Sequence, residues 1–346
     1  MQNAFFRAAR LCVALLVVSL VWVGCGCTGG TTAVIEKFPL TDSLRADVWR
    51  IPAENYYPQA MVVSNGRLIV HNLKSDYLFQ VFDLRTREFL YEDGEIGRGG
   101  NDFEGEPDRT SMCPDAEGFG IRVNHEWYRV AVGETGLRVL EKSVLADMKV
   151  PVNNALPLRD GWFCTESSSS DRRNKAYTFV NKDTREVFHA TPFPQHVLKT
   201  NAKLSTDRAA AYAKNGVVHP SGDRFAAFYS RFKAFQILSD RGRVLKTVRV
   251  DITPFSVIYD RLSSRRFYGY ISTPATDGEY IYALCAGSEE EENYDVAATE
   301  LQVFDWNGAP VASYKLDHYV HHIAVSGRTV YAINTFKPNE IYVYSL

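Results

Sequence analysis

Short apolar runs recur along this chain, and each is interrupted by a polar turn that contains a glycine. The runs are rich in Val, Ile, Tyr and Phe and are too short for helices, which is typical of β-strands. Two such runs around one glycine turn predict a β-hairpin. Six of these hairpins are spaced 43 to 61 residues apart, and they turn at Gly66, Gly118, Gly161, Gly222, Gly278 and Gly327.

A second hairpin follows each of the first five. In each, an alternating apolar strand meets a polar turn and then a further strand. One unit therefore has four strands, named a to d, in about fifty residues, which suits a propeller blade better than a helical repeat. The second hairpins are LFQVFDLRTREFLYE (78–92), YRVAVGETGLRVLEK (128–142), AYTFVNKDTREVFHA (176–190), FQILSDRGRVLKTVRV (235–250) and LQVFDWNGAPVASYKL (301–316).

The sixth unit stops at its c strand, NEIYVYSL (339–346), where the sequence ends. An apolar segment that precedes the first unit, AVIEKFPL (33–40), is available to supply the missing d strand. A strand from the N-terminus that completes the last blade would close the ring and remove an open sheet edge. The sequence therefore predicts an all-β fold, a six-bladed β-propeller of four-stranded blades, as a single domain over residues 33–346.

The N-terminus has the pattern of an exported protein. Two arginines precede a 13-residue apolar run, as in a signal peptide over residues 1–24. Small residues followed by Cys25 are typical of a lipoprotein signal, although Trp22 departs from the usual pattern and Cys27 is an alternative acceptor. We expect lipidation of Cys25, attachment to the membrane through that lipid, and a flexible tether over residues 25–32.

A glycine-rich, acidic stretch, GEIGRGGNDFEGEP (94–107), stands between the first two units. It fails the dinucleotide pattern, because Asp102 occupies the place of the third glycine after Gly97 and Gly99, and no helix pattern follows. It lacks the Lys of a phosphate-binding loop and the acidic spacing of a calcium loop. The stretch is therefore interpreted as the connection from strand d of blade 1 to strand a of blade 2, and no cofactor is expected.

The segment GRGGNDF (97–103), on a chain with a lipoprotein-type start and six β units, resembles the TolB-like six-bladed propeller lipoproteins of bacterial envelopes. The resemblance covers residues 33–346 as repeats and is close only in this motif, where Gly100 replaces a more usual Pro. It implies the propeller fold and a location in the bacterial cell envelope, with the outer membrane expected. It implies no catalytic residues, since that group is known mainly as propellers of unassigned function.

Composition and charge add little chemistry. A formal net charge of −2 gives no basic excess for nucleic acid, so no nucleic-acid partner is expected. Cys164 and Cys285 end apolar runs and are expected to be small buried residues. No spacing indicates a disulfide, and no linear enzyme motif is present.

The long connections follow strands b and d, which places nearly all irregular chain on one face. Binding residues commonly lie on loops held by a rigid scaffold. Within one such loop, RLSSRRFYGY (261–270), arginine and tyrosine side chains are typical of contact hot spots. An unknown protein, peptide or glycan is the expected partner, and the candidate contact residues are Arg265, Arg266, Tyr268 and Tyr270.

Histidines offer a second hypothesis. His322, beside His321 on the inner strand of blade 6, and His219 in blade 4 are expected to line the central channel. They are candidate ligand-binding residues, and an enzyme, a hydrolase or lyase with residues around the channel mouth, is the alternative to a binding scaffold. No metal site is expected, because three or four convergent ligands are not apparent.

Overall fold

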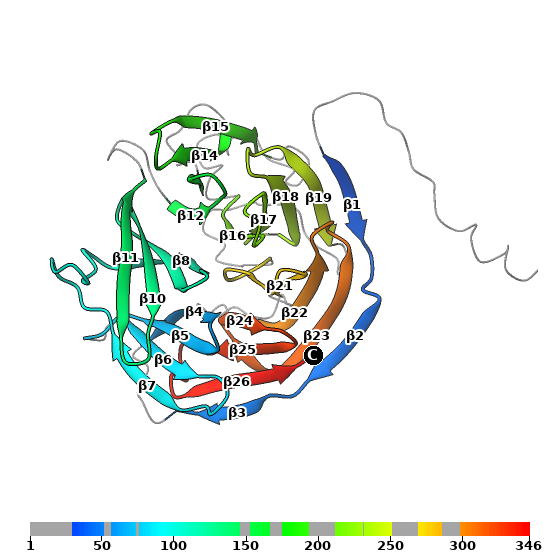
Figure 1. The fold of residues 1–346 in the computed structure, drawn as a ribbon. Coiled ribbons are helices and arrows are strands. Elements are labelled where there is room, and N and C mark those ends of the chain that lie inside the picture. The colour runs from blue at the N-terminus through cyan, green and yellow to red at the C-terminus, as the bar shows by residue number, and fades with distance from the viewer. Residues whose placement is uncertain are drawn as a thin grey trace, which may run out of the picture.

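The computed structural model describes residues 30–51, 57–73, 76–145, 153–166, 175–193, 212–230, 232–250, 269–285 and 298–346. Six four-stranded blades stand in a ring around a central channel, which confirms the predicted propeller (Figure 1). Neighbouring strands within each blade are antiparallel. Within the described residues, no helix is long and apolar enough to cross a membrane.

Each predicted hairpin takes its expected place in a blade. Strands a, next to the channel, are β4 (Pro58–Ser64), β8 (Pro107–Pro114), β12 (Asn153–Pro157), β16 (Lys214–Val218), β20 (Ala275–Thr276) and β24 (His322–Ser326). Strands b are β5 (Arg67–Asn72), β9 (Gly118–Val123), β13 (Trp162–Glu166), β17 (Arg224–Tyr229), β21 (Tyr280–Cys285) and β25 (Thr329–Ile333).

Strands c are β6 (Phe79–Asp83), β10 (Glu126–Val132), β14 (Lys175–Asn181), β18 (Ala234–Ser239), β22 (Ala298–Asp305) and β26 (Glu340–Ser345). The outer strands d are β7 (Phe89–Asp93), β11 (Leu137–Val144), β15 (Val187–Pro192), β19 (Val244–Val250), β23 (Pro310–Val320) and β3 (Asp47–Arg50). Blades 1 to 6 begin at β4, β8, β12, β16, β20 and β24 in that order.

An N-terminal strand closes the ring, but it is not the one predicted. β3 pairs antiparallel with β26 and completes blade 6, so residues 33–40 do not take that place. Alternation explains the fit: Trp49 packs edge-on against Phe82 of blade 1 at 5.6 Å, while Val48 joins the core shared by blades 5 and 6. The apolar signal in β3 is two residues among charges, which is too short to stand out in the sequence.

The residues that were expected to close the ring form a belt around its outside. β1 (Thr31–Ile35) pairs in parallel with β19 of blade 4, and β2 (Leu40–Leu44) pairs in parallel with β23 of blade 5 (Figure 1). Phe38, between them, is buried against Phe304 at 5.6 Å. Strand pairing begins at Thr31, so the last two residues of the predicted tether, 31 and 32, belong to β1.

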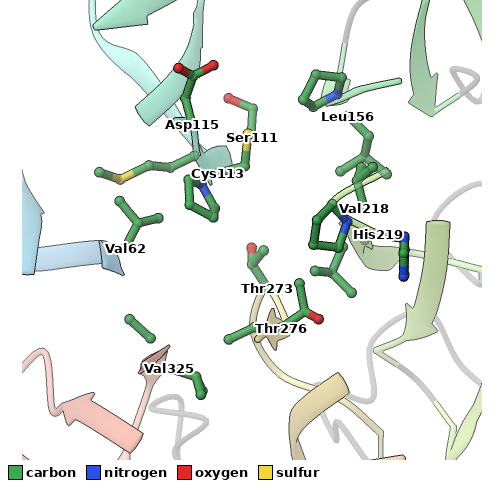
Figure 2. A pocket seen from close by; sticks show the side chains of 18 of the residues that line it. Val62, Ser111, Cys113, Asp115, Leu156, Val218, His219, Thr273, Thr276 and Val325 are labelled. Carbon is green, nitrogen blue, oxygen red and sulfur yellow. The ribbon is translucent and has the colours of Figure 1, made fainter. Parts of the chain in front are cut away.

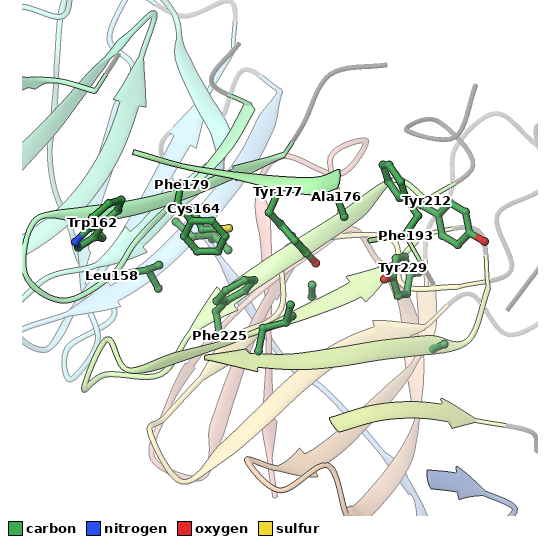
Figure 3. Close-up of a cluster of buried hydrophobic side chains, with 14 of the residues drawn as sticks. Leu158, Trp162, Cys164, Ala176, Tyr177, Phe179, Phe193, Tyr212, Phe225 and Tyr229 are labelled. Carbon is green, nitrogen blue, oxygen red and sulfur yellow. The ribbon is translucent and has the colours of Figure 1, made fainter. Parts of the chain in front are cut away.

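The core lies between blades, because each sheet buries both faces against its neighbours. Between blades 3 and 4, Tyr177 meets Phe225 edge-on at 5.5 Å, and Phe179 contacts the same ring (Figure 3). Cys164 and Cys285 are buried and form no disulfide, which confirms their interpretation as small core residues. The aromatic strands therefore supply the large interfaces that fix one blade against the next.

The glycine turns also join blades to one another. Gly222 has φ +69° in the a–b turn of blade 4, a conformation that disfavours a side chain. A Cβ on Gly222 would lie 2.7 Å from the backbone nitrogen of Arg159 in the a–b turn of blade 3. That nitrogen donates a hydrogen bond to the Gly222 carbonyl, so the a–b turns of blades 3 and 4 are joined directly.

The stretch 94–107 connects β7 to β8, as predicted, and it is a packing loop. Phe103 is buried, stacks on Tyr128 at 5.3 Å and contacts Phe79 at 5.3 Å. The Asp102 carboxylate accepts a hydrogen bond from the Gly99 N–H at 2.7 Å. Asn101 binds the backbone of β11 through both ends of its amide. The loop's polar groups are thus used to hold the loop itself in place.

Candidate functional site

A cavity of about 700 Å³ occupies the end of the channel that carries the a–b turns. Every blade contributes the last part of its inner strand, so the cavity is built by the ring as a whole (Figure 2). Its wall is mainly apolar. The side chains that define it best are Val62, Met112, Leu156, Val218, Thr276 and Val325.

The inner strands also bring backbone groups to the cavity. β4, β8, β12, β16, β20 and β24 each stand at the end of their sheet, with a partner strand on one side only. An edge strand presents unpaired N–H and C=O groups on its open side. The cavity therefore combines apolar side chains with backbone donors and acceptors, the arrangement usual in small binding sites.

Charged side chains at the mouth of the cavity already have internal partners. The Arg159 guanidinium donates to Asp240 at 2.6 Å, which ties the turn of blade 3 to blade 4. The Asp115 carboxylate accepts two hydrogen bonds from Arg129, each at 3.1 Å. Burial by itself would raise the pKa of Asp115, but hydrogen bonds from Arg129 and the Glu117 N–H lower it overall. Arg159 and Asp115 are thus held in ion pairs, whereas the exposed Asp277 carboxylate at the mouth is held by neutral donors: the Glu279 and Tyr280 N–H groups and the Tyr282 hydroxyl.

His219 lies at the cavity, as the sequence predicted, in the turn that follows β16. Its Nδ1 is 2.6 Å from Ser221 Oγ and 3.8 Å from Asp223, and the Ser221 N–H donates to the same nitrogen. A catalytic triad needs one ring nitrogen for the nucleophile and the other for the acid. Here one nitrogen meets all three groups, so the trio is a turn-stabilising network.

The protonation states agree with that interpretation. Burial, aided by Arg224, lowers the pKa of His219, so the ring is neutral at pH 7 and Nδ1 can accept. Cys113 also lines the cavity, and burial raises the pKa of its thiol to about 12. A neutral thiol is a weak nucleophile.

His322 lies at the other end of the channel. It begins β24, whereas His219 follows the end of β16, and the inner strands run in the same direction through the ring. The expectation that both histidines surround one channel mouth is therefore wrong. Burial, with Arg109, His321 and His71 nearby, lowers the pKa of His322 to about 3, so it is neutral.

The arginine–tyrosine loop is described only at its end. Arg265, Arg266 and Tyr268 lie outside the described residues, so their expected role remains a prediction. Tyr270 is described and fully buried, and its hydroxyl donates to Gln302 at 2.8 Å. Tyr270 is a core residue that cannot contact a partner, because its ring packs between Phe228 of blade 4 and Phe304 of blade 5. Cys25 and Cys27 also lie outside the described residues.

The described part of the chain contains no group of three or more His, Cys, Asp or Glu side chains arranged to hold a metal ion. The cavity itself was missed by sequence reasoning, which concentrated on the long loops of the opposite face. A signal was present: several a strands end in apolar residues and proline just before the turn, as at Cys113–Pro114 and Leu156–Pro157.

Comparison with known proteins supports the fold and no more. No model of a protein family matches the chain, and no curated protein matches it. A member of the DUF4221 family from Bacteroides vulgatus matches with a TM-score of 0.51 and 12% identity, over 88% of this chain and 97% of that one. A putative exported protein from Bacteroides fragilis matches with a TM-score of 0.50 and 9% identity, over 91% and 99%. Such low identity shows a shared propeller and leaves the TolB-like resemblance a prediction.

Proposed function

We propose that this protein is a lipid-anchored envelope propeller that binds a short apolar peptide segment of a partner protein in the central cavity. The observation that carries the proposal is the apolar wall to which all six inner strands contribute. A volume of about 700 Å³ is within the range of ligand pockets, roughly 300–1,000 Å³.

The chemistry of the wall favours an apolar peptide. Side chains such as Met112, Leu156 and Val218 can bury apolar groups of a ligand, and the open strand edges can hydrogen-bond its main chain. A glycan would bring many hydroxyls, and burying them without partners is costly. Since Arg159 and Asp115 at the mouth are already paired, we expect affinity to come mainly from apolar contact and backbone hydrogen bonds.

A binding role also agrees better with the histidines than catalysis does. His219 is held in a turn network, His322 lies at the far end, and Cys113 is a neutral thiol. The face opposite the cavity carries the long b–c and d–a connections. It is a second proposed contact surface for the same partner, through Arg265, Arg266 and Tyr268. Its loops are where the sequence places hot-spot residues.

The anchor is proposed from the sequence. Cys25 follows an apolar run and small residues, and we propose that it carries the lipid, with Cys27 as the alternative acceptor. A propeller of similar fold described as a putative exported protein is compatible with envelope location, and the outer membrane is the proposed site.

A cavity-filling substitution tests the binding site. Peptides selected from a random library on the full chain would be synthesised with a fluorescent label, and their affinities measured by anisotropy. Val218→Trp places a large ring in the cavity and should weaken binding at least about tenfold, or roughly 1.4 kcal/mol. Val187→Trp, on the exposed outer strand of blade 3, is the matched control and should leave affinity unchanged.

Two results would contradict the proposal: no apolar peptide is enriched, or Val218→Trp and Val187→Trp bind the peptide alike. Either result would mean that the cavity is not the binding site. Thermal melting of both variants would confirm that each is folded before affinities are compared.

A further inference from the structure

We infer that the outer edge of blade 4 is the surface that contacts the membrane, through anionic lipid headgroups. The inference rests on the proposed lipid anchor at Cys25 and adds where the ring meets the bilayer. Two separate features of blade 4 point to it: the attachment of the N-terminal strand and the charge of its outer strand.

The N-terminal segment is fixed to blade 4 from Gly30 onward. A Cβ on Gly30 would lie 2.5 Å from the Leu245 carbonyl oxygen, so the backbone passes directly against β19. β1 then pairs with β19 from Thr31↔Lys246 to Ile35↔Val250. Val244 and Leu245 directly follow the c–d turn of blade 4, so the described chain leaves the outer edge of blade 4 at the end of the ring that carries the a–b and c–d turns.

The covalent distance from the proposed anchor is short. Five residue steps separate Cys25 from Gly30, and a fully extended chain covers at most about 18 Å over that length. A compact domain of this size has a radius of gyration of about 20 Å, hence a diameter of roughly 50 Å. An anchored ring must hold blade 4 beside the bilayer, while blade 1, on the opposite side of the ring, stays far from it.

Charge distinguishes the outer edge of blade 4 from the outer edges of the other five blades. Among the six outer strands that the structure describes, β19 alone carries basic residues, Lys246 and Arg249, without an acidic one. The c–d turn before it adds exposed Arg243, and the belt adds exposed Lys37, opposed by Glu36. Basic groups near an anionic surface are attracted to it over a Debye length. Blade 4 thus presents a basic edge where the tether begins.

Site-specific fluorescence quenching tests the orientation. The full chain, purified with its lipid, would be reconstituted into vesicles that contain phosphatidylglycerol and lipids with spin-labelled headgroups. An environment-sensitive dye would be placed on a cysteine at Thr32 on the rim of blade 4, at Glu117 in an a–b turn, or at Phe336 in a b–c connection. Cys27→Ser is the background, and the chain without an introduced cysteine reports labelling of Cys113.

We expect the dye at position 32 to lose most of its fluorescence, and dyes at 117 and 336 to be unaffected. Quenching at 117 or 336 instead, on a chain shown by mass spectrometry to be lipidated, would overturn the rim contact and leave the anchor intact. A chain without lipid on Cys25, or one that does not float with vesicles, would overturn the anchor and the inference together.

A charge variant separates the basic edge from the tether. Arg243→Gln, Lys246→Gln and Arg249→Gln combined should leave lipidation and flotation unchanged and should reduce quenching at position 32. The matched control replaces Arg50, Arg85 and Arg328, all exposed and away from blade 4, by Gln. Equal quenching in the variant and in wild type would overturn the role of charge.

Discussion

Phe103 shows how one side chain turns a glycine-rich loop into part of the core. It stands between Phe79 of blade 1 and Tyr128 of blade 2, and it is almost fully buried. Glycines around it allow close approach: a Cβ on Gly97 would lie 2.2 Å from the Asp102 carboxylate. The loop's composition suggests ligand binding, whereas its contacts are those of a wedge between two blades.

Removing that wedge should destabilise the fold. Phe103→Ala deletes a buried aromatic side chain and should cost about 3–5 kcal/mol of unfolding free energy, measured by urea denaturation. Gly100→Ala is the matched control in the same loop, because a Cβ there meets nothing within 4 Å. Similar midpoints for both variants would show that the loop does not pack as described.

Part of the loss of folding stability at acid pH should come from His71. Its ring is buried, and burial, with Arg109 nearby, lowers its pKa from 6.5 to about 4, while Asp108 acts in the opposite direction. The unfolded chain therefore binds more protons than the folded chain between these values, so stability falls as pH drops from about 6.5 to 4. The full effect is on the order of 3 kcal/mol.

The His71→Leu variant isolates this contribution. It should show a shallower loss of unfolding free energy than wild type between pH 6.5 and 4, with the difference closing above pH 7. Chemical denaturation at several pH values measures both slopes. Parallel pH curves for the two proteins would mean that His71 does not titrate on unfolding.

The N-terminal strands differ in what they do for the ring. β3 completes blade 6 and brings Trp49 and Ile51 into the interface with blade 1. β1 and β2 add to blades that already have four strands, and they bury Ile35 and Phe38 on blades 4 and 5. One segment of the chain thus closes the ring and covers two outer edges.

Stepwise truncation should separate these roles. A chain that begins at residue 46 keeps β3 and should remain monomeric and folded, with about 3–6 kcal/mol less stability from the loss of Ile35 and Phe38. A chain that begins at residue 52 loses β3 and should aggregate, since strand c of blade 6 becomes an open edge. Size-exclusion chromatography and thermal melting distinguish them, with a chain from residue 30 as control.

The pattern of elements was largely readable from the sequence, because glycine turns and alternating strands are local signals. All six a–b hairpins and the five following c–d hairpins lie where they were predicted. The strand Asp47–Arg50 was missed because it has only two apolar residues. Their role is visible only in the folded ring, where Val48 and Trp49 pack into the cores on either side of blade 6. Tyr270 was misplaced because a tyrosine at the end of a basic loop looks exposed until its strand partner is known.

The candidate site could not be read in the same way, since it belongs to the ring and to no single motif. Each inner strand contributes a few ordinary apolar residues, and only closure of six blades encloses them. Sequence reasoning found His219, which lies at the cavity, but paired it with His322 at the other end. Whether two positions share one end of the channel depends on strand direction and register.

At the scale of the whole molecule, the two ends of the channel differ in character. The a–b-turn end is apolar and tied together by turns, while the end near His71, His322 and Arg109 gathers polar side chains. The first can hold apolar groups, and the second faces the long connections. We therefore assign the proposed ligand to the a–b-turn end.

Crosslinking in cells from defined positions in the full chain tests that assignment. A small diazirine amino acid, close in size to methionine, would replace Val325 in the cavity, Phe336 on the opposite face, or Val187 on the rim. Mass spectrometry of the irradiated envelope would identify what each position contacts. We expect crosslinks to an apolar segment of one partner from position 325 and none from position 187. A partner captured only from position 336 would contradict that assignment and move the binding site to the loops.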